Sequence, residues 1–219
     1  MNRASFNRSN ISHPANLRVA ALVVWAAWMV VLAATPPAWA QSRANAEYTV
    51  KMVFMYNFLK FMDWPKEKVA DSNEPLIIGV IGENVFGDAF KAIEQKTVDN
   101  RKVIVKRFKG IDELEKAGEK EPSQPHPQRE TIRASHLLFL CPSEKEHVKE
   151  ILRYVEESHT LTVADTEGFL EQGGIINLLL EDDKVGFEIN LTAAKRAGIQ
   201  IRSKLLRLAK RTYKPPEEE

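Results

Sequence analysis

Four short apolar runs, separated by segments of helical character, constrain the fold of this chain more than any other feature. The runs are LIIGVI (76–81), VIVKRF (103–108), HLLFLC (136–141) and LTVA (161–164). Between them, residues 85–95, 111–117 and 143–157 are expected to be helical, and Ser143 and Glu146 in the last segment have capping-box spacing. Strands that alternate with helices predict a largely parallel sheet with helices on both faces.

The pattern changes after the fourth run. Gly173-Gly174 introduces IINLLLE, Asp182-Asp183 marks a turn, and VGFEIN follows, which together predict a β-hairpin. Residues 191–197 and 204–213 are expected to be helical. The predicted fold class is therefore α/β, with a mixed, mostly parallel sheet covered by helices on both faces and a C-terminal antiparallel hairpin at its edge.

A long apolar helix is expected before the first strand. Residues 47–63 (EYTVKMVFMYNFLKFMD) lack Pro and Gly and carry apolar groups on most of the circumference, so this helix must be covered on more than one side. Trp64-Pro65 predicts its end, because a proline disfavours helical geometry in the preceding residue. Residues 118–131 (GEKEPSQPHPQRET) combine Pro, Gly and charge without periodicity, which predicts a solvated loop or insertion.

The first 40 residues have the features of a signal peptide. Three arginines and no acidic residue precede the apolar run VAALVVWAAWMVVLAA, and Ala38-Trp39-Ala40 supplies a small-x-small cleavage pattern. A cleaved leader (1–40) is favoured over an uncleaved membrane anchor, because the apolar run is shorter than the roughly 20 residues that a spanning helix needs. The remaining divisions are one domain at 41–214 and an acidic, disordered tail at 215–219.

Charge argues against nucleic acid as a partner. Without the three leader arginines, 28 Lys and Arg residues face 30 Asp and Glu residues, and the two signs are interspersed. A nucleic-acid-binding domain normally carries a basic patch that such a balance does not provide.

Catalytic and metal-binding templates fail on this sequence. Gly82 and Gly87 have phosphate-loop spacing, but Asp88-Ala89 stands where Lys and Ser or Thr are needed. No H-E-x-x-H or G-x-S-x-G occurs, and no cysteine pair supports a zinc site. The single cysteine, Cys141, follows an apolar strand, which favours a buried, inert thiol over the nucleophile of a secreted hydrolase. We therefore expect no enzyme activity, no metal and no cofactor.

Polar residues and glycines gather in the last third of the chain. Asp165 directly follows an apolar strand, at the carboxyl end where α/β sheets form ligand crevices. The candidates for a ligand pocket or a docking surface are Asp165, Gly168, Phe169, Gly173, Gly174, Asn177, Glu188 and Asn190. The alternative, weighed equally, is that these groups only tie the hairpin to the sheet.

This segment and VKMVFMYNFLKFMDWP (50–65) resemble the YfiR-like family of secreted proteins. The similarity includes an aromatic helix that ends in Trp-Pro, the strands IGVIG and SHLLFLC, and the closing run LTV-x-D-x-x-GF-x-x-x-GG-x-I-N with F-E-I-N-x-x-A-A and L-x-I-x-S-x-LL. These motifs occur in order across essentially the whole chain after the leader.

The resemblance implies a regulatory role in the periplasm. A protein of this type would be a homodimer that represses an inner-membrane diguanylate cyclase, or a similar membrane sensor, by binding its periplasmic sensor part, and an outer-membrane lipoprotein would capture it in turn. The family type carries paired cysteines, so a chain with Cys141 alone puts control by internal disulfides in doubt. A periplasmic small-molecule binding protein is the alternative function.

The first predicted helix carries more aromatic side chains than one face can cover. Protein interfaces favour such anchors. We expect about half of them in the core and the rest available to a second subunit or a partner; the candidates are Phe54, Tyr56, Phe58, Phe61 and Trp64.

Overall fold

The computed structural model describes residues 38–69, 74–93, 95–120 and 127–214. The chain divides into two units, Met1–Arg43 and Ala44–Glu219, and the second holds the folded domain. Most of the predicted signal peptide and the whole predicted tail (215–219) lie outside the described residues, so both stay predictions. Among the described helices, none is both long enough and apolar enough to cross a membrane.

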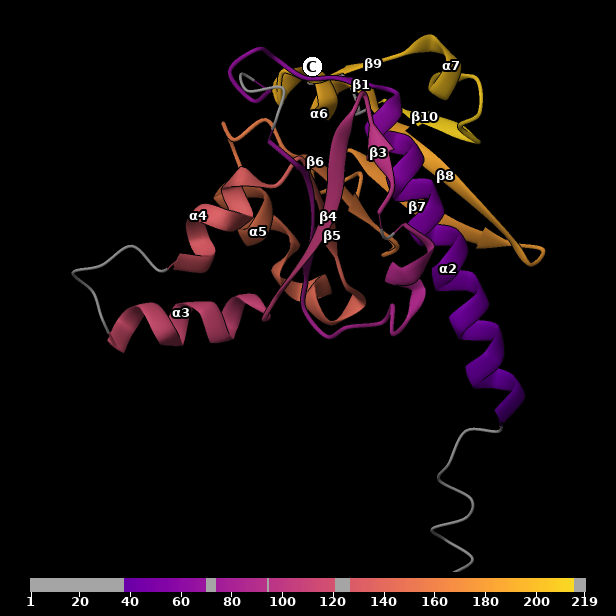
Figure 1. Cartoon of the computed structure of the whole chain (residues 1–219), viewed down its shortest axis with the longest axis horizontal. Helices are drawn as coiled ribbons and strands as arrows, with labels where there is room; N and C mark the ends of the chain where they lie inside the picture. The colour runs from indigo at the N-terminus through magenta and orange to yellow at the C-terminus, as the bar shows by residue number, and fades with distance from the viewer. Residues whose placement is uncertain (1–37, 70–73, 94, 121–126, 215–219) are drawn as a thin grey trace, which may run out of the picture. The chain divides into compact units, whose positions relative to one another are not determined.

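A mixed sheet forms the centre of the domain (Figure 1). Its spatial order is β10-β8-β7-β6-β5-β2-β4-β3, and every neighbouring pair is parallel except β7 with β8 and β3 with β4. The strands are β2 (Leu76–Ile81), β3 (Thr97–Val98), β4 (Arg101–Phe108), β5 (Leu137–Leu140), β6 (Leu161–Ala164), β7 (Ile176–Glu181), β8 (Lys184–Asn190) and β10 (Arg211–Tyr213). The predicted fold class is confirmed.

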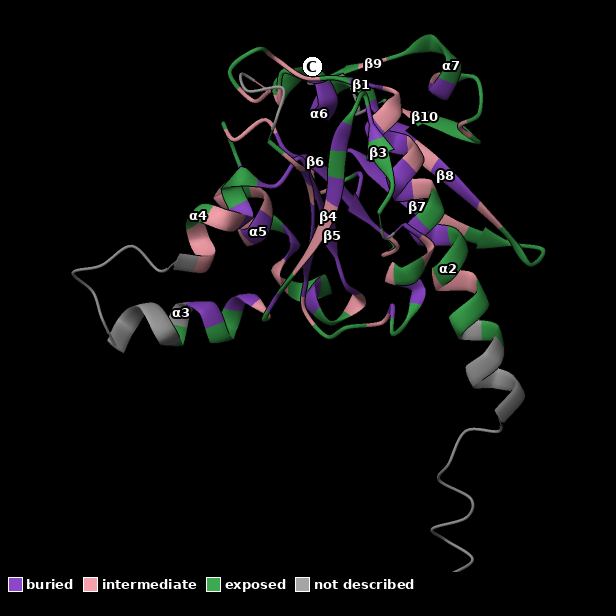
Figure 2. Ribbon diagram, in the orientation of Figure 1, coloured by how far each residue is buried: buried purple, intermediate pink, exposed green. Residues whose placement is uncertain are grey.

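Helices cover both faces of this sheet, and two separate apolar cores result (Figure 2). The helices are α2 (Ala38–Lys60), η1 (Ala89–Ala92), α3 (Ile111–Lys120), α4 (Pro127–Ala134), η2 (Pro142–His147), α5 (Val148–Tyr154), α6 (Leu191–Arg196) and α7 (Ser203–Leu206). Helices α2, α6 and α7 pack on one face, and α3, α4 and α5 pack on the other. Strand side chains alternate between the cores, as Phe139 and Leu140 do, because successive residues of a strand point to opposite faces.

Helix α2 ends at Lys60, three residues before the predicted end. The chain then forms β1 (Met62–Asp63), which pairs antiparallel with β9 (Gln200–Ile201). Arg202 fixes this ending, since its guanidinium donates to the Lys60 carbonyl at 3.0 Å and to the Asp63 carboxylate at 2.6 Å. A distant arginine therefore ends the helix earlier than the Trp-Pro signal does.

Residues 85–95 do not form the expected helix. They contain only the short 3-10 helix η1, and Gly87 (φ +48°) and Gln95 (φ +63°) lie in the left-handed region, which interrupts a right-handed helix. Phe86 and Ile93 are nevertheless buried. The apolar spacing marked buried positions correctly, although the backbone between them is mostly irregular.

The capping box expected at residue 143 is also wrong. The segment 143–157 is a 3-10 helix, η2, continued by α5 to Tyr154. The Ser143 hydroxyl accepts a hydrogen bond from the Glu83 amide at 3.0 Å and donates to the Glu144 carboxylate at 3.0 Å. Because these contacts occupy it, Ser143 does not cap a helix.

The solvated loop predicted at 118–131 is shorter than expected. Helix α3 continues to Lys120 and α4 begins at Pro127. Ile132 of α4 is fully buried, and Arg133 donates to the Tyr154 carbonyl at 3.0 Å. These two contacts stabilise a helical segment whose composition is typical of a loop.

The hairpin is confirmed, but it is not the edge of the sheet. Asp182 (φ +48°) and Asp183 (φ +60°) form the turn between β7 and β8, as a two-residue hairpin loop requires. The helix expected at 204–213 is wrong, because α7 ends at Leu206 and the chain then forms β10, parallel to β8. The aliphatic stem of Lys210 lies on Gly186, where a Cβ atom would come within 2.6 Å of it. This lysine and β10 cover the outer edge of the hairpin.

Candidate functional site

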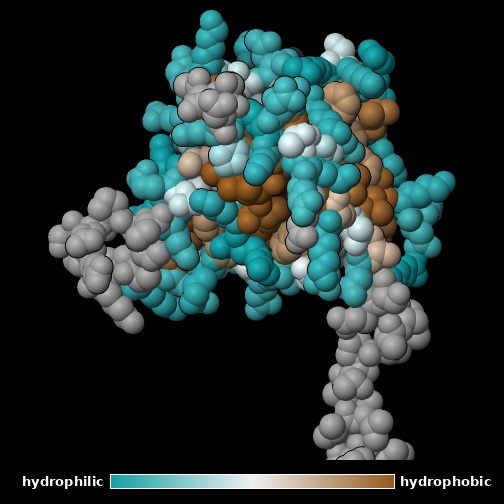
Figure 3. All heavy atoms as spheres, in the orientation of Figure 1, coloured by the Kyte–Doolittle hydropathy of each residue, from teal (hydrophilic) through white to brown (hydrophobic). Residues whose placement is uncertain are grey.

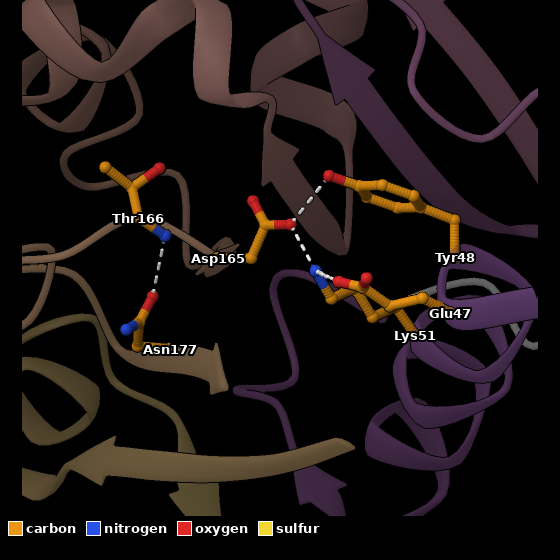
Figure 4. A network of polar contacts seen from close by, with 6 residues as sticks. All are labelled: Glu47, Tyr48, Lys51, Asp165, Thr166 and Asn177. Carbon is orange, nitrogen blue, oxygen red and sulfur yellow. Dashed lines mark hydrogen bonds and ion pairs between the residues drawn. The ribbon is translucent and has the colours of Figure 1, made fainter. Parts of the chain in front are cut away.

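A polar network joins the middle of α2 to the carboxyl end of β6 (Figure 4). One carboxylate oxygen of Asp165 accepts hydrogen bonds from the Lys51 ammonium at 2.6 Å and the Tyr48 hydroxyl at 3.0 Å. Glu47 lies 2.5 Å from the same ammonium. The Lys51 and Asp165 side chains are only 5% and 4% exposed, so this is a buried ion pair. It connects residues that are 114 positions apart in the sequence.

Burial dominates the electrostatics of this region. It raises the pKa of the Tyr48 phenol well above its usual value, and the neighbouring Asp165 charge adds to the effect. Burial also raises the pKa of the Cys141 thiol to about 12, with smaller contributions from Asp165 and Glu144. A buried thiol that stays protonated at neutral pH is a poor nucleophile.

The second oxygen of Asp165, Oδ1, is buried and has no hydrogen-bond partner among the described residues. The bonded oxygen, Oδ2, points to α2, so Tyr48 and Lys51 occupy the α2 side of this strand end, while Asp165 also lines a hollow on the β7 side. Lys51 lies 4.4 Å from the centre of the Tyr48 ring, and this ring packs edge-on against Phe86 at 5.2 Å. The network is thus enclosed by apolar side chains on the α2 side of the sheet.

Four of the predicted ligand residues line one hollow of about 510 Å³ beside β7 and β8. They are Asp165, Gly168, Asn177 and Glu188. Glu167, Glu171 and Glu181 add further carboxylates, whereas Arg211 brings a positive charge and pairs with Glu188 at 2.8 Å. The structure brings these residues together, and a ligand role for them stays a prediction.

Two of the candidate amides have specific structural partners. Asn177 Oδ1 accepts from the Thr166 amide at 3.1 Å, which ties β7 to the loop after β6. Asn190 Oδ1 accepts from the Ala193 amide at 2.9 Å and so caps α6, while its Nδ2 donates to the Leu170 carbonyl at 3.0 Å. Both amides fix the hairpin to its surroundings.

The remaining candidates lie in the packed loop between β6 and β7. Phe169 is fully buried, and Gly174 lies so close to its ring that a Cβ atom would come within 2.2 Å of a ring carbon. Gly173 has φ +102°, a conformation that favours glycine. These three residues allow the loop to pack closely onto the sheet.

The five aromatic candidates occupy buried and partly buried positions, and two of them, Phe61 and Trp64, lie just after α2. Tyr56 and Phe58 are buried, whereas Phe54, Phe61 and Trp64 are partly buried. Their role in binding stays a prediction. Sequence reasoning missed the two most exposed apolar residues of the described part of α2, Val50 (43%) and Val53 (39%). Val50, Val53 and Phe54 have i, i+3, i+4 spacing, which places them on one side of a helix and could have identified this apolar side from the sequence.

Sequence reasoning also missed Tyr48, Lys51 and Glu144. The Glu144 carboxylate is buried and accepts from the Ile111 amide at 3.0 Å, so it caps α3 from the 3-10 helix η2, which follows β5. Gly110 permits this approach, since a Cβ atom there would lie 2.7 Å from the carboxylate. In the described part of the chain, no group of three or more His, Cys, Asp or Glu residues is arranged to hold a metal ion.

Three solved structures share part of this architecture at low similarity. A conserved domain protein from Vibrio cholerae O1 biovar eltor str. N16961 has 14% identity and a TM-score of 0.43, over 68% of this chain and 57% of its own. The ABC domain from Streptococcus pneumonia in complex with L-Trp has 11% identity and a TM-score of 0.44, over 63% and 55%. The open, ligand-free substrate binding protein CD0873 from Clostridium difficile has 14% identity and a TM-score of 0.42, over 64% of this chain and 55% of its own. The chain thus spans little more than half of each, and similarity this low supports no conclusion about function.

Sequence comparison is more informative at the level of the family. No curated protein matches this chain. The model of the YfiR/HmsC-like family, DUF4154, matches residues 48–210, which include every candidate residue discussed above. This chain therefore belongs to the YfiR/HmsC-like family, whose known members are periplasmic regulators of diguanylate cyclases.

Proposed function

We propose that this protein is a periplasmic regulator that binds and represses the sensor part of an inner-membrane diguanylate cyclase or a similar membrane sensor. The observation that carries the proposal is an apolar surface formed by the exposed Val50 and Val53, the partly buried Phe54, and Phe61 just after the helix; it is called here the α2 face. Apolar helix surface that the protein leaves in contact with water is typical of interaction sites. The family is regulatory and not catalytic, which supports action through protein contact.

The contacts beneath the α2 face hold it in one conformation. Phe58 is fully buried and packs against the Phe187 ring of β8, with ring centres 5.1 Å apart. Phe54 packs on the same ring at 5.8 Å. The Lys51–Asp165 ion pair fixes the preceding turn. A surface ordered before binding loses less conformational entropy when the partner arrives, so it binds more tightly.

Further partners follow from the family and belong to the same proposal. Export through the predicted signal peptide places the chain in the periplasm, where it reaches the sensor part of the membrane protein. We propose that it forms a homodimer there and that an outer-membrane lipoprotein competes for it. The α2 face is the surface that we assign to one of these contacts, because its apolar side chains suit a protein partner.

Genetic complementation tests this function. Deletion of the gene is expected to raise cellular cyclic-di-GMP, and the wild-type gene is expected to restore the low level. A Val53→Glu variant is expected to fail, because it places a charge in the centre of the α2 face. Leu208→Glu is the matched control, since Leu208 is 63% exposed and belongs to the segment between α7 and β10.

Two results would count against the proposal. If the deletion leaves cyclic-di-GMP unchanged, the partner is not a diguanylate cyclase. If Val53→Glu restores repression as well as the control, the α2 face is not the contact surface. Export is tested separately by fractionation, because an intact leader on a cytosolic protein would contradict a periplasmic site of action.

A small-molecule binding function is the second candidate, and the hollow lined by Asp165, Asn177 and Glu188 favours it. Its carboxylates suit a ligand that carries an amine. Thermal shift measurements against a set of periplasmic solutes test it, since a ligand at 100 times its Kd adds about 2.7 kcal/mol to the free energy of unfolding. No stabilisation by any amine would contradict this function.

A further inference from the structure

Among the strands that the structure describes, none lies beside the outer edge of β4 over more than half of its length. Strand β3 pairs only with Arg101 and Lys102 of β4, and the Val103 amide then donates to the Lys96 carbonyl at 3.0 Å. No described strand pairs with residues 104–108 from that side. Unpaired backbone groups on such an edge can accept another strand.

The direction of these backbone groups follows from the printed hydrogen bonds. The Val103 amide points outward to Lys96, whereas the Phe108 carbonyl points inward and accepts from the Gly82 amide at 3.3 Å. Because direction alternates along a strand, the amides and carbonyls of Val105 and Arg107 also point outward. These two residues present the donors and acceptors of an open edge.

A hollow of about 420 Å³ runs beside this edge. Phe90 and Ile93 line it from the segment after β2, and Val103, Val105 and Arg107 line it from β4. Figure 3 shows hydrophobic side chains gathered in the middle of this face, over the position of β4 in Figure 1, with hydrophilic residues around them. The hollow is also lined by Gln95 and by Asp88, which pairs with Lys91 at 3.1 Å. The edge therefore offers a partly apolar groove together with its backbone groups.

The charge of β4 selects the kind of strand that fits. Residues 101–109 (RKVIVKRFK) contain five basic residues and no acidic residue. Lys106 and Arg107 lie on the uncovered part, and the Arg107 guanidinium lies 5.4 Å from the centre of the Phe90 ring. Two copies of this edge would place like charges together, which disfavours self-pairing. An acidic strand would meet opposite charge.

The far edge of the sheet differs. There, β10 pairs with the end of β8, and the Lys210 stem lies on Gly186. The Lys210 amide also donates to the Phe187 carbonyl at 2.9 Å. A further strand is thus hindered from pairing at the β10 edge of the sheet, whereas it can pair with β4 at the opposite edge.

We propose that the outer edge of β4 at residues 104–108 is a docking slot for an extended, acidic segment of a partner protein, which adds to the sheet as a further strand. Its backbone would bond to Val105 and Arg107, its apolar side chains would enter the groove beside Phe90, and its carboxylates, on the other face of the strand, would lie near Lys106. This inference rests on the proposed function as a partner-binding regulator and adds a second surface to the α2 face.

Peptide binding to the full chain tests the slot. The probe is an end-blocked ten-residue peptide of alternating Glu and Val, and its control is the same peptide with Lys in place of Glu. The acidic peptide is expected to bind at least about tenfold more tightly, a difference of about 1.4 kcal/mol. It is also expected to slow hydrogen exchange at the Val105 and Arg107 amides.

Two variants make the test specific. Val105→Pro removes an outward donor without breaking a bond to β2, so it is expected to reduce affinity at least about tenfold. Val105→Thr keeps the donor and a β-branched shape, and is expected to bind like the wild type. If Val105→Pro does not fold, Lys106→Glu replaces it, with the same expected loss through charge repulsion with the carboxylates of the peptide.

The outcomes separate this proposal from the preceding one. Equal binding of both peptides, or protection away from β4, overturns the slot and leaves the α2 face untouched. A dimer that dissociates in Val105→Pro shows that the occupant is a second copy, which also overturns it. If Val105→Pro lowers peptide affinity and still represses cyclic-di-GMP fully, the membrane sensor does not use the slot.

Discussion

Two buried carboxylates, Asp165 and Glu144, lie beyond the carboxyl ends of neighbouring central strands and are stabilised in different ways. Asp165 is paired with the Lys51 ammonium of α2 at 2.6 Å. Glu144 instead accepts from the first amide of α3, on Ile111, and from the Ser143 hydroxyl. One negative charge is balanced by a cation from a distant helix, and the other by the positive end of a helix dipole and by hydrogen bonds.

The difference shows how each region of the domain is held. The Asp165 pair attaches α2, and with it the α2 face, to the end of β6. The Glu144 contacts attach α3 to the end of β5, on the opposite face of the sheet. Loss of a cation leaves an uncompensated buried charge, whereas loss of a capping oxygen leaves one unsatisfied amide. The two carboxylates should therefore differ in how strongly variants act.

The largest expected effect is that of Lys51→Met. This change leaves the Asp165 charge buried without its cation, and it is expected to lower the free energy of unfolding by about 3 to 5 kcal/mol. Urea denaturation followed by circular dichroism measures the loss. The double variant Lys51→Met with Asp165→Asn is the control, and it should lose less because no unpaired charge remains. Equal losses would show that the ion pair contributes only through packing.

Acid is expected to lower the free energy of unfolding of the whole domain. The variants of Lys51 and Glu144 are therefore compared at neutral pH. Burial, with smaller effects of the Lys68 and Arg101 charges, lowers the pKa of His136 from 6.5 to about 3. The unfolded chain therefore binds a proton that the folded chain does not between these values. The stabilising contribution is complete above pH 6.5 and is lost as the pH falls toward 3, which amounts to about 2 kcal/mol between pH 7 and pH 5.

A His136→Asn variant separates this residue from the carboxylates. Its amide oxygen can take the place of Nδ1, which accepts from the Ile77 amide at 3.2 Å. The variant is expected to be less stable at neutral pH and to depend less on pH between 7 and 5. Urea denaturation at both pH values measures the dependence, and an unchanged slope would assign the acid sensitivity to other groups.

The smallest expected effect is at Glu144. Glu144→Ala removes the oxygen that caps α3 and should lower the free energy of unfolding by about 1 to 2 kcal/mol. Glu144→Gln keeps an acceptor and should cost less than about 1 kcal/mol. Hydrogen exchange at the Ile111 amide gives a local measurement. A loss as large as that of Lys51→Met would mean that Glu144 has a further role.

The sequence predicted the regular elements wherever local pattern and tertiary packing agree. The strands at 76–81 and 161–164 were confirmed because their apolar runs are buried on both faces of the sheet. Asp182-Asp183 predicted its turn because both residues tolerate the left-handed backbone of that loop. Asp165 was singled out for its place after a strand, and the structure confirms that place.

Predictions failed where a distant residue changed a local preference. Ser143 bonds across to Glu83 in place of capping. The helix expected at 85–95 is the exception, because Gly87 within it has a left-handed backbone. Residues 211–213 pair with β8, although they were expected to continue a helix from 204. The partners of Asp165 could not be predicted, because Tyr48 and Lys51 are more than a hundred positions away.

The sequence alone determined the α/β class, the order of most strands along the chain, the hairpin and the similarity to its family, because these depend on periodicity and on motifs close together in the chain. Only the tertiary structure decided that Lys51 pairs with Asp165, that β10 covers one edge of the sheet and that β4 leaves the other open. Such features depend on contacts between segments that are far apart in the sequence, and local sequence patterns do not specify those contacts.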